Sequence, residues 1–587
     1  MRRGRSATTA ARRPRPRRGL VLSIAAFACA CAFVVQSPGW AQTSYMALTR
    51  AIGQGTPHID RWHWQTHDVA YTDGHFYSVK PPGLSVLTLP LYEGLRAVGA
   101  EGAARHARTR GEDGGRYPWG ARKLQPQSYG FSAKRARISQ AAIANDAPMT
   151  WALGLLGVVL PAALLLWLVA RVVERVAPGT GTAAALTLGA ATMILPFSTL
   201  YFSHVLSAVL GFAAFALVWR ERDGPPRVRL LALAGLLGGL AVVFEYPLAI
   251  AALIVGLYAL SRPGSRAALL PRAVAYGTGA VAGVLPLLAY NWWAFGSPLH
   301  MSYANAVSKT GFTGHQYLGL NDGGVFGITA PRLGDGLMLL FSGRGLLTLS
   351  PVLVVAIAGV VLMHREGWRA EARTIGAIAL AYLVYNAGYW LPMGGGSPGP
   401  RFLIPILPFL AVGLGLAWKR WSAVTLALAA ISATSMTVAT MTYPMIGDND
   451  TGVWLHRLFD LGVVQHSVLD LAGVAHGVVS ILPFAVGVAV ALGLGVATLG
   501  RTELVRGVGM APVAIGAWAA CALVLPNPGG LPSKEAIWLV AGSAVVALLA
   551  IGLALVSGRR APRSAQEEDH HAAAPLSLEV QPAQRGG

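Results

Sequence analysis

Charged residues and cysteines are scarce in this sequence, and each shortage excludes a class of protein. Only 12% of the 587 residues are charged, whereas 54% are hydrophobic, and an ordinary soluble domain carries about 25% charged residues. A soluble fold of this length could not bury so much apolar surface. The three cysteines all lie inside apolar segments, so they provide neither a disulfide framework nor a cysteine metal site.

Long apolar segments occupy most of the chain instead. The segments 149–170, 271–293 and 475–499 are nearly free of charge, and about 20 apolar residues suffice to cross the hydrocarbon core of a membrane. The formal net charge of +21 does not indicate nucleic-acid binding, because the basic residues form short clusters at the ends of apolar segments. That distribution is typical of membrane topology.

The sequence predicts an all-α polytopic membrane protein with about 14 transmembrane helices. A basic leader at 1–18 precedes the first apolar run, which we interpret as a retained span, although a cleaved signal peptide would have a similar pattern. The predicted spans are 19–41, 149–170, 181–200, 202–219, 229–244, 246–261, 272–293, 345–363, 374–392, 402–418, 422–443, 475–499, 508–525 and 536–557.

The basic residues also predict the orientation of these spans. The apolar segment 84–98 is barely long enough to cross and is interrupted by Glu93 and Arg96, so we expect an interfacial helix on the outer surface. Most lysines and arginines after the second span then fall in cytoplasmic loops, as the positive-inside rule requires, and both termini are cytoplasmic. One tension is that the basic stretch 105–137 then lies outside.

This topology divides the chain into four regions. The leader at 1–18 is followed by a transmembrane module at 19–445, whose first extracytoplasmic loop covers 43–148. An additional transmembrane region at 446–557 and a cytoplasmic tail at 558–587 complete the chain. The tail is rich in alanine, proline, glutamine and histidine, which is typical of disorder.

The first outer loop concentrates side chains that can carry chemistry. It contains acids, histidines, aromatic residues and a lysine that two prolines follow. A polar surface loop with a turn at Asp73-Gly74 is the simpler interpretation, but loops held by a rigid scaffold often carry sites. The two relevant stretches are His58-Ile59-Asp60-Arg61-Trp62 and Tyr71-Thr72-Asp73-Gly74-His75-Phe76-Tyr77-Ser78-Val79-Lys80-Pro81-Pro82-Gly83.

The order of these features resembles a known family of membrane enzymes. A basic leader, a first span, a long outer loop with Tyr-Ser-Val-Lys-Pro-Pro-Gly at 77–83 and many later spans are similar to the GT-C glycosyltransferases. The similarity is greatest to the family 39-like branch of protein O-mannosyltransferases and aminoarabinose transferases. It covers about 19–445 and includes Asn-Trp-Trp-Ala-Phe-Gly-Ser-Pro at 291–298 and Gly-Pro-Arg-Phe-Leu-Ile-Pro-Ile-Leu-Pro at 399–408.

The resemblance implies transfer of a sugar from a polyprenyl-phosphate carrier to a glycan, lipid or protein acceptor outside the bacterial inner membrane. A carboxylate would take the proton from the acceptor, and basic side chains would stabilise the departing phosphate. Lys80 matches the family's phosphate-contacting lysine before proline. Further substrate-binding candidates are Arg401 and Arg344, by position only, and Tyr77, His75 and Asp73.

The sequence departs from the family pattern at its acids. Gln42-Thr43-Ser44-Tyr45 stands where the family has an acidic pair after the first span, and Val79 stands where an acid precedes the lysine. We therefore expect Asp60, the first acid after the first span, to be the general base, with Asp68 and Asp73 as alternatives. An inactive or diverged member of the family is a further possibility.

Two ionisable residues at the predicted membrane edge are also catalytic candidates. His204 begins the fourth span, and Glu245 lies between the fifth and the sixth. Ionisable groups so close to hydrocarbon are costly and by default suggest function. The alternative is that both residues cap helical hairpins in the headgroup region.

We expect no metal and no cofactor, with a divalent metal as the remaining alternative. Asp448-Asn449-Asp450 formally spells a metal motif but is more typical of a turn. His63 and His67 have helical spacing for a metal but lack a further ligand. The competing functions are a flippase or transporter of lipid-linked sugars and a non-catalytic scaffold of envelope assembly.

Overall fold

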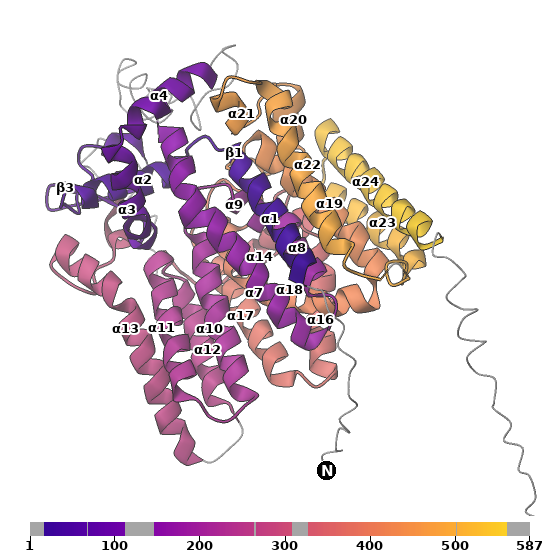
Figure 1. The fold of residues 1–587 in the computed structure, drawn as a ribbon, viewed down its shortest axis with the longest axis horizontal. Helices are drawn as coiled ribbons and strands as arrows, with labels where there is room; N and C mark the ends of the chain where they lie inside the picture. Colours follow the sequence, from indigo (N-terminus) through magenta and orange to yellow (C-terminus); the bar gives the residue numbers. More distant parts are fainter. Residues whose placement is uncertain are drawn as a thin grey trace, which may run out of the picture.

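The computed structural model describes residues 17–66, 68–111, 146–262, 266–307, 327–500 and 502–559. Most of these residues are helical, and the helices form a bundle with a smaller mixed part at one end (Figure 1). The residues 1–16, 112–145 and 560–587, which include most of the leader, part of the first loop and the tail, lie outside the described residues. The prediction of an all-α polytopic membrane protein is confirmed.

Length and composition identify seven helices among the described residues that could cross a membrane. An eighth span results if the segments Leu333–Leu349 and Val352–Arg365, which meet at a 92° bend, are counted together. The seven are Asp146–Val176, which contains α7 (Leu160–Val176), α10 (His204–Arg222), α13 (Leu269–Phe295), Arg401–Arg420, which contains α18 (Leu407–Arg420), α19 (Ser422–Thr442), α22 (Gly477–Val496) and most of α24 (Lys534–Arg559).

Shorter apolar helices occupy five of the other predicted spans, so the number of 14 spans stays a prediction. These helices are α1 (Arg17–Phe33), α8 (Gly181–Ala190), α11 (Val228–Phe244), α12 (Leu248–Leu260) and α23 (Ala511–Val524). The remaining helices of the bundle and its connections are α9 (Ile194–Phe197), α14 (Leu333–Phe341), α15 (Leu346–Leu349), α16 (Val352–Arg365), α17 (Arg369–Gly388), α20 (Val453–Phe459) and α21 (Val468–Leu471).

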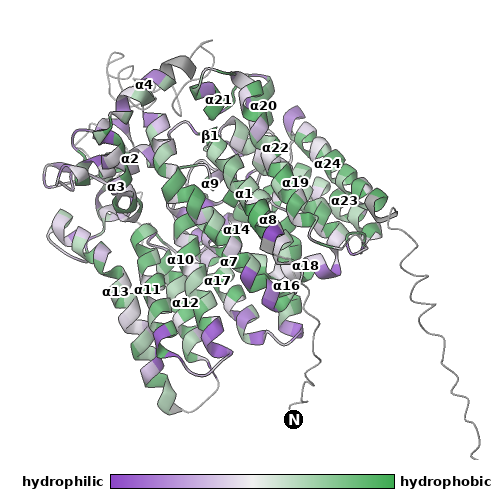
Figure 2. Cartoon of the chain, viewed as in Figure 1, coloured by the Kyte–Doolittle hydropathy of each residue, from purple (hydrophilic) through white to green (hydrophobic). Residues whose placement is uncertain are grey.

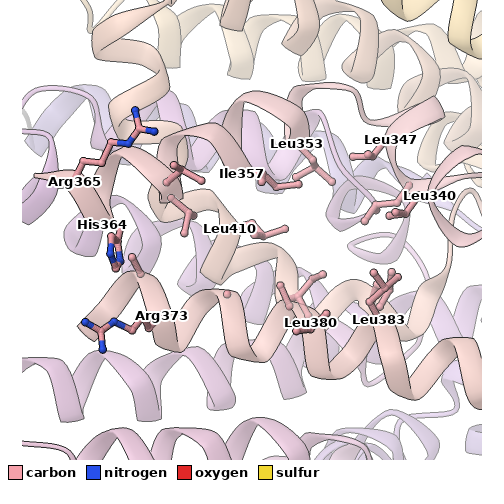
Figure 3. A pocket seen from close by; sticks show the side chains of 18 residues that line it. Leu340, Leu347, Leu353, Ile357, His364, Arg365, Arg373, Leu380, Leu383 and Leu410 are labelled. Carbon is pink, nitrogen blue, oxygen red and sulfur yellow. The ribbon is translucent and has the colours of Figure 1, made fainter. Parts of the chain in front are cut away.

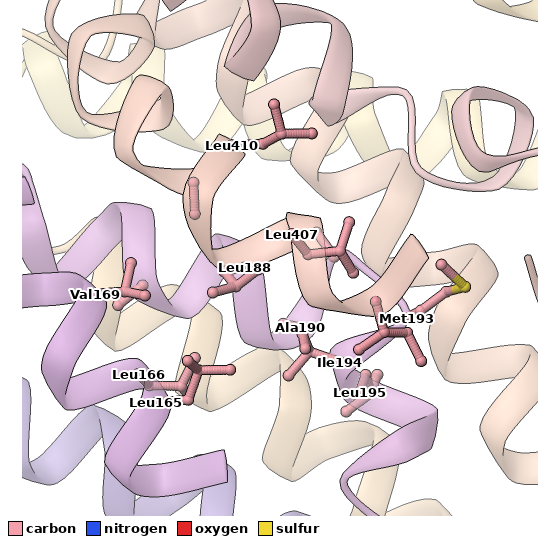
Figure 4. Packing of buried hydrophobic residues seen from close by; sticks show 14 of the residues in the cluster. Leu165, Leu166, Val169, Leu188, Ala190, Met193, Ile194, Leu195, Leu407 and Leu410 are labelled. Atoms are coloured by element: carbon pink, nitrogen blue, oxygen red, sulfur yellow. The ribbon is translucent and has the colours of Figure 1, made fainter. Parts of the chain in front are cut away.

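One continuous cluster of buried apolar side chains holds the bundle together. In Figure 4, leucines of α7 and α8 meet Ile194 and Leu195 of α9 and Leu407 of α18, and these side chains are fully buried. Figure 2 shows hydrophobic residues along the helices of the bundle and hydrophilic ones toward helix ends and the part around α2 and α4. Hydrophobic side chains thus lie along the helices, as expected for a protein whose helices are surrounded by a lipid bilayer.

The mixed part is built from the segment between the first two predicted spans. Its helices are α2 (Trp40–Gly53), α3 (Gly83–Ala97) and α4 (Ala100–Gly111), which lie near β3 in Figure 1. The helix predicted at 84–98 is thus present as α3. It buries Leu84 and exposes Val86 and Leu87, as an interfacial helix would.

A small antiparallel sheet completes this part, with strand order β3-β2-β4. The strands β2 (Val69–Thr72) and β3 (His75–Ser78) form a hairpin in which Val69 pairs with Ser78 and Thr72 with His75. Asp73 and Gly74 both have positive φ, 52° and 83°, as the tight turn between two such strands requires. The predicted turn is therefore confirmed, and β4 (Ala306–Val307) adds a strand from the second outer loop.

A second, two-stranded pairing joins the first helix to the C-terminal region. Strand β1 (Val34–Val35) directly follows α1 and pairs with β5 (His466–Ser467). The helix α1 also packs on α22. The region after residue 445 is therefore packed against the beginning of the chain.

Glycines set the close packing of α11 on α13. A Cβ atom added at Gly235, Gly239 or Gly279 would lie only 2.0 to 2.1 Å from a backbone oxygen of the facing helix. Small residues at such positions let helix backbones approach closely in membranes. This contact matters for function because α11 ends one residue before Glu245.

We predict that Gly279→Ala destabilises the protein whereas Gly277→Ala on the same helix does not. The added methyl at 279 would meet the backbone oxygen of Ala232 at 2.0 Å, but the one at 277 meets nothing within 4 Å. Overpacking costs about 1–3 kcal/mol, and alanine otherwise favours a helix over glycine by up to about 1 kcal/mol. Thermal unfolding of both variants in detergent measures the difference. Equal melting temperatures would contradict the close contact of α11 and α13.

Candidate functional site

An ion pair lies at the open end of the β2–β3 hairpin, where the chain leads into α3. Lys80 Nζ lies 2.7 Å from Asp68 Oδ2, and the two side chains are 10% and 28% exposed. Ser44 of α2 holds both ends of the hairpin, because its hydroxyl donates to the Asp68 carbonyl at 2.7 Å and contacts Ser78 Oγ at 2.8 Å. Ser78 Oγ in turn accepts from the Lys80 amide. The helix α2 thus fixes the positions of both charged residues.

The two ionisable residues at the predicted membrane edge form a second group. His204 Nδ1 lies 3.1 Å from Glu245 Oε1, and both side chains are buried. Ser203 donates a hydrogen bond to the same carboxylate oxygen, and Tyr45 of α2 contacts Ser203 Oγ at 2.5 Å. Glu245 lies in the turn between α11 and α12, outside both helices. The structure therefore brings the two sequence candidates together and adds Ser203 and Tyr45.

Charges connect the two groups. Burial acts to raise the pKa of Glu245, but His204 and then Lys80 lower it, and the pKa ends below its ordinary value. Glu245 therefore stays ionised at neutral pH. Burial and then the charge of Glu245 raise the pKa of Tyr45 well above its ordinary value. The Tyr45 hydroxyl consequently stays protonated and can donate a hydrogen bond.

Arg401 lies beside these residues, whereas Arg344 supports the loop before it. The Arg401 guanidinium lies 5.6 Å and 5.5 Å from the ring centroids of Phe202 and Phe402, and its charge acts on Tyr45. Arg344 Nη1 instead donates to three backbone oxygens, those of residues 395, 397 and 446, at 3.0 to 3.1 Å. Of these two predicted substrate-binding arginines, only Arg401 has a charge that acts on the buried Tyr45.

A cavity of about 240 Å³ opens next to Glu245. Burial, Tyr389 and then the carboxylates of Glu245 and Asp68 raise the pKa of Tyr303, which lines this cavity. The charges of both carboxylates thus act on the same residue of this cavity, Tyr303. Five of the cavity's ten lining residues are aromatic, namely Tyr246, Tyr303, Tyr385, Tyr389 and Phe402, and Glu245 is the charged one.

A larger apolar cavity lies elsewhere, between α16, α17 and α18. It measures about 520 Å³ and is lined mainly by leucine, isoleucine and valine side chains (Figure 3). Three basic residues, His364, Arg365 and Arg373, lie together at one end of it in Figure 3. None of the predicted site residues lines this cavity.

The remaining predicted residues of the first loop form a separate group at the hairpin. The Asp60 carboxylate accepts from the Phe76 amide at 2.7 Å and lies 2.7 Å from His75 Nδ1. Tyr77 is buried, and Asp73 lies in the turn. Within the described part of the chain, the polar contacts of Asp60 stay inside the loop and do not reach Lys80 or Glu245.

The two metal motifs of the sequence have local structural roles where they are described. The Ser533 hydroxyl, just before α24, donates to the Asp450 carboxylate, whose two oxygens lie 2.8 and 3.0 Å from it, and the Asp450 amide donates to Asp448. His63 Nδ1 lies 2.6 Å from the Asp60 carbonyl oxygen, and its ring stacks on Phe76. His67 lies outside the described residues.

Sequence reasoning ranked Asp68 second and missed Ser203, Tyr45 and the aromatic cavity. The turn at Asp73-Gly74 gives a two-residue hairpin, and its register places Asp68 opposite Val79. That register could have been derived from the sequence. The approach of α2 to the turn after α11 could not, because it depends on tertiary packing.

Solved structures offer two comparisons with this fold. A crystal structure of ArnT from Cupriavidus metallidurans bound to undecaprenyl phosphate is 13% identical, with a TM-score of 0.38, and covers 84% of this chain and 79% of that chain. The apo crystal structure of the same protein is 14% identical, with a TM-score of 0.40, and covers 84% and 78%.

No protein-family model matches the sequence. No curated protein matches it either.

The different placements of the two arginines predict different effects of their removal. Arg344→Gln should lower the melting temperature, because buried backbone oxygens lose a charged donor, at a cost of roughly 1–3 kcal/mol for each oxygen left without a partner. Arg401→Gln should leave the melting temperature near that of the wild type. Thermal unfolding in detergent tests both, and a larger loss for Arg401→Gln would show that the two roles are reversed.

Proposed function

We propose that this chain transfers a sugar from a polyprenyl-phosphate carrier to an acceptor at the outer face of the bacterial inner membrane. The observation that carries the proposal is the Lys80–Asp68 ion pair, which lies beside the ionised Glu245 and the charge of Arg401. Charged groups next to an aromatic cavity suit a reaction in which charge develops, because they can stabilise that charge in the transition state. Membrane lipids surround the site, and the acceptor is a glycan, a lipid or a protein.

Lys80 is proposed to bind the phosphate of the carrier. In the free protein, its ammonium group is paired with Asp68 at 2.7 Å. A phosphate is a stronger charge partner that accepts several hydrogen bonds, so it would compete with Asp68 for this ammonium group. During transfer the bond between the sugar carbon and the phosphate oxygen breaks, and Lys80 with Arg401 stabilises the negative charge on the departing phosphate.

Asp68 is then the carboxylate best placed to act as the general base. Once the phosphate takes over Lys80, Asp68 can accept the proton from the acceptor hydroxyl whose oxygen forms the new bond to the sugar. Asp60, the base predicted from the sequence, remains a candidate, but its carboxylate already binds Phe76 and His75. Glu245 is assigned a supporting role and not that of the base, because Ser203 and His204 already bind its carboxylate.

The aromatic cavity is proposed to hold the donor. Sugar rings and isoprenoid chains both pack well on aromatic side chains, and a few polar groups in such a pocket give specificity. Glu245 and the tyrosine hydroxyls of the cavity offer those polar groups.

We predict that Lys80→Ala loses most of its transfer activity, by roughly 10²- to 10³-fold. Lys80→Arg should keep part of it, because the charge remains while the geometry changes. Lys534→Ala is the control, since this lysine pairs with Asp460 and Glu535 away from the site. Mass spectrometry of envelope glycans, in a deletion strain that carries each variant, gives the activity. Wild-type glycans with Lys80→Ala at normal protein levels would remove Lys80 from the mechanism.

The three carboxylates can be ranked by removing their charge one at a time. Asp68→Asn should slow transfer by about 10²- to 10⁴-fold, the usual effect of losing a general base, while the variant still binds undecaprenyl phosphate. Asp60→Asn and Glu245→Gln should have smaller effects. The measurement is transfer activity together with carrier binding by native mass spectrometry.

The ranking has clear contrary outcomes. If Asp60→Asn or Glu245→Gln is the most damaged variant, the base is that residue and not Asp68. If all three variants make normal glycans, the chain is not a transferase of this kind, and the flippase or scaffold function takes its place.

A further inference from the structure

Three metal-binding side chains converge at the outer hairpin, apart from the proposed transfer site. His58, Asp60 and His75 each offer one ligand atom, and these atoms lie within 4.8 Å of one another. Two of the three belong to the segment before the hairpin, and His75 is the first residue of β3. All three are partly exposed, so an ion could enter from the outside.

The distances suit a tetrahedral ion after a small adjustment. Asp60 Oδ2 lies 2.7 Å from His75 Nδ1 and 3.9 Å from His58 Nδ1. Ligand atoms about 2.0–2.1 Å from a zinc ion at tetrahedral angles lie about 3.3 Å apart. The distance from Asp60 to His75 must therefore increase, and the distance from Asp60 to His58 must decrease, each by about 0.6 Å. Side-chain rotations can supply both changes.

Neighbouring groups already orient two of the three ligands, Asp60 and His58. The second oxygen of Asp60 accepts from the Phe76 amide at 2.7 Å, which fixes the carboxylate. His58 Nε2 lies 3.4 Å from the Tyr77 hydroxyl, so this nitrogen can carry the proton and leave Nδ1 unprotonated. Metal-binding histidines are commonly held by a hydrogen bond from the other ring nitrogen in this way.

The presence of two histidines also favours a bound metal ion over a simple hydrogen bond between side chains. The rings of His58 and His75 lie 3.9 Å apart, centre to centre. Neutral imidazoles and a carboxylate are the donors that zinc accepts. A hydrogen bond that only ties the loop together would need Asp60 and only one of the two histidines.

We propose that His58, Asp60 and His75 bind one Zn²⁺ ion, with water completing its coordination. The ion would displace the proton shared by His75 and Asp60, which is released to solvent. It would join the segment around residue 60 to β3, and the end of β3 leads directly to Lys80. Zinc would thus stiffen the hairpin that positions the Lys80–Asp68 pair. The proposal does not depend on the transfer reaction.

The test uses Zn²⁺ and the full chain, purified without a polyhistidine tag. The adjacent histidines at 570 and 571 are replaced by alanine in every protein so that the tail cannot bind metal. After removal of metal with a chelator, zinc binding is measured by calorimetry and the metal content by mass spectrometry. His58→Asn and His75→Asn are compared with His300→Asn and His456→Asn. His300 pairs with Asn305, and His456 belongs to a different group with Asp460.

We expect the protein to bind one Zn²⁺ tightly and each ligand variant to bind it at least about 100-fold more weakly. The size follows from the 10- to 100-fold effects of merely removing groups that orient a ligand. The two control variants should bind as the unchanged protein does.

Folding of each variant is checked by circular dichroism and by gel filtration, and His75→Gln serves as a second variant if His75→Asn does not fold. Proteolysis of the first loop gives an independent readout, because zinc should slow it in the control proteins but not in the ligand variants. The proposal is wrong if the metal-free protein takes up no zinc. It is equally wrong if His58→Asn and His75→Asn bind zinc normally, or if only His456→Asn abolishes binding.

Discussion

The ion pair between Lys80 and Asp68 is the interaction on which the candidate site depends. It is held from one side by Ser44 of α2, and the buried Glu245 network also reaches α2, through Tyr45. A lysine so little exposed needs a charged partner. The pairing with Asp68 holds the Lys80 side chain in place until a competing anion arrives, which is what a phosphate-binding group requires.

The bundle contributes by fixing the turn after α11. Glycines let α11 and α13 approach to backbone contact, and Glu245 follows directly after α11. A Cβ added at Gly83, the first residue of α3, would lie 2.7 Å from the backbone oxygen of Val243. The outer loop is therefore seated on the end of α11. This contact is the physical reason that Lys80 and Glu245 influence each other.

Much of the architecture follows from the sequence, because apolar length and the distribution of basic residues predict helices in a membrane. The turn at Asp73-Gly74 was also predictable, since such pairs favour the left-handed backbone of tight hairpins. The sequence also singled out Lys80, Glu245 and His204. It ranked Asp60 above Asp68 by order along the chain, but the hairpin register places Asp68 beside Lys80. Contacts between distant segments, such as Tyr45 with Ser203, leave no local pattern from which to predict them.

The most direct test of the account is an experimental structure of the full chain with undecaprenyl phosphate. The account predicts a phosphate within hydrogen-bond distance of Lys80 Nζ, with the Asp68 carboxylate released from the 2.7 Å pairing of the free protein and the isoprenoid chain leading from the aromatic cavity toward lipid. A phosphate bound instead at His364, Arg365 and Arg373 of the larger cavity, with the Lys80–Asp68 pair intact, would contradict it.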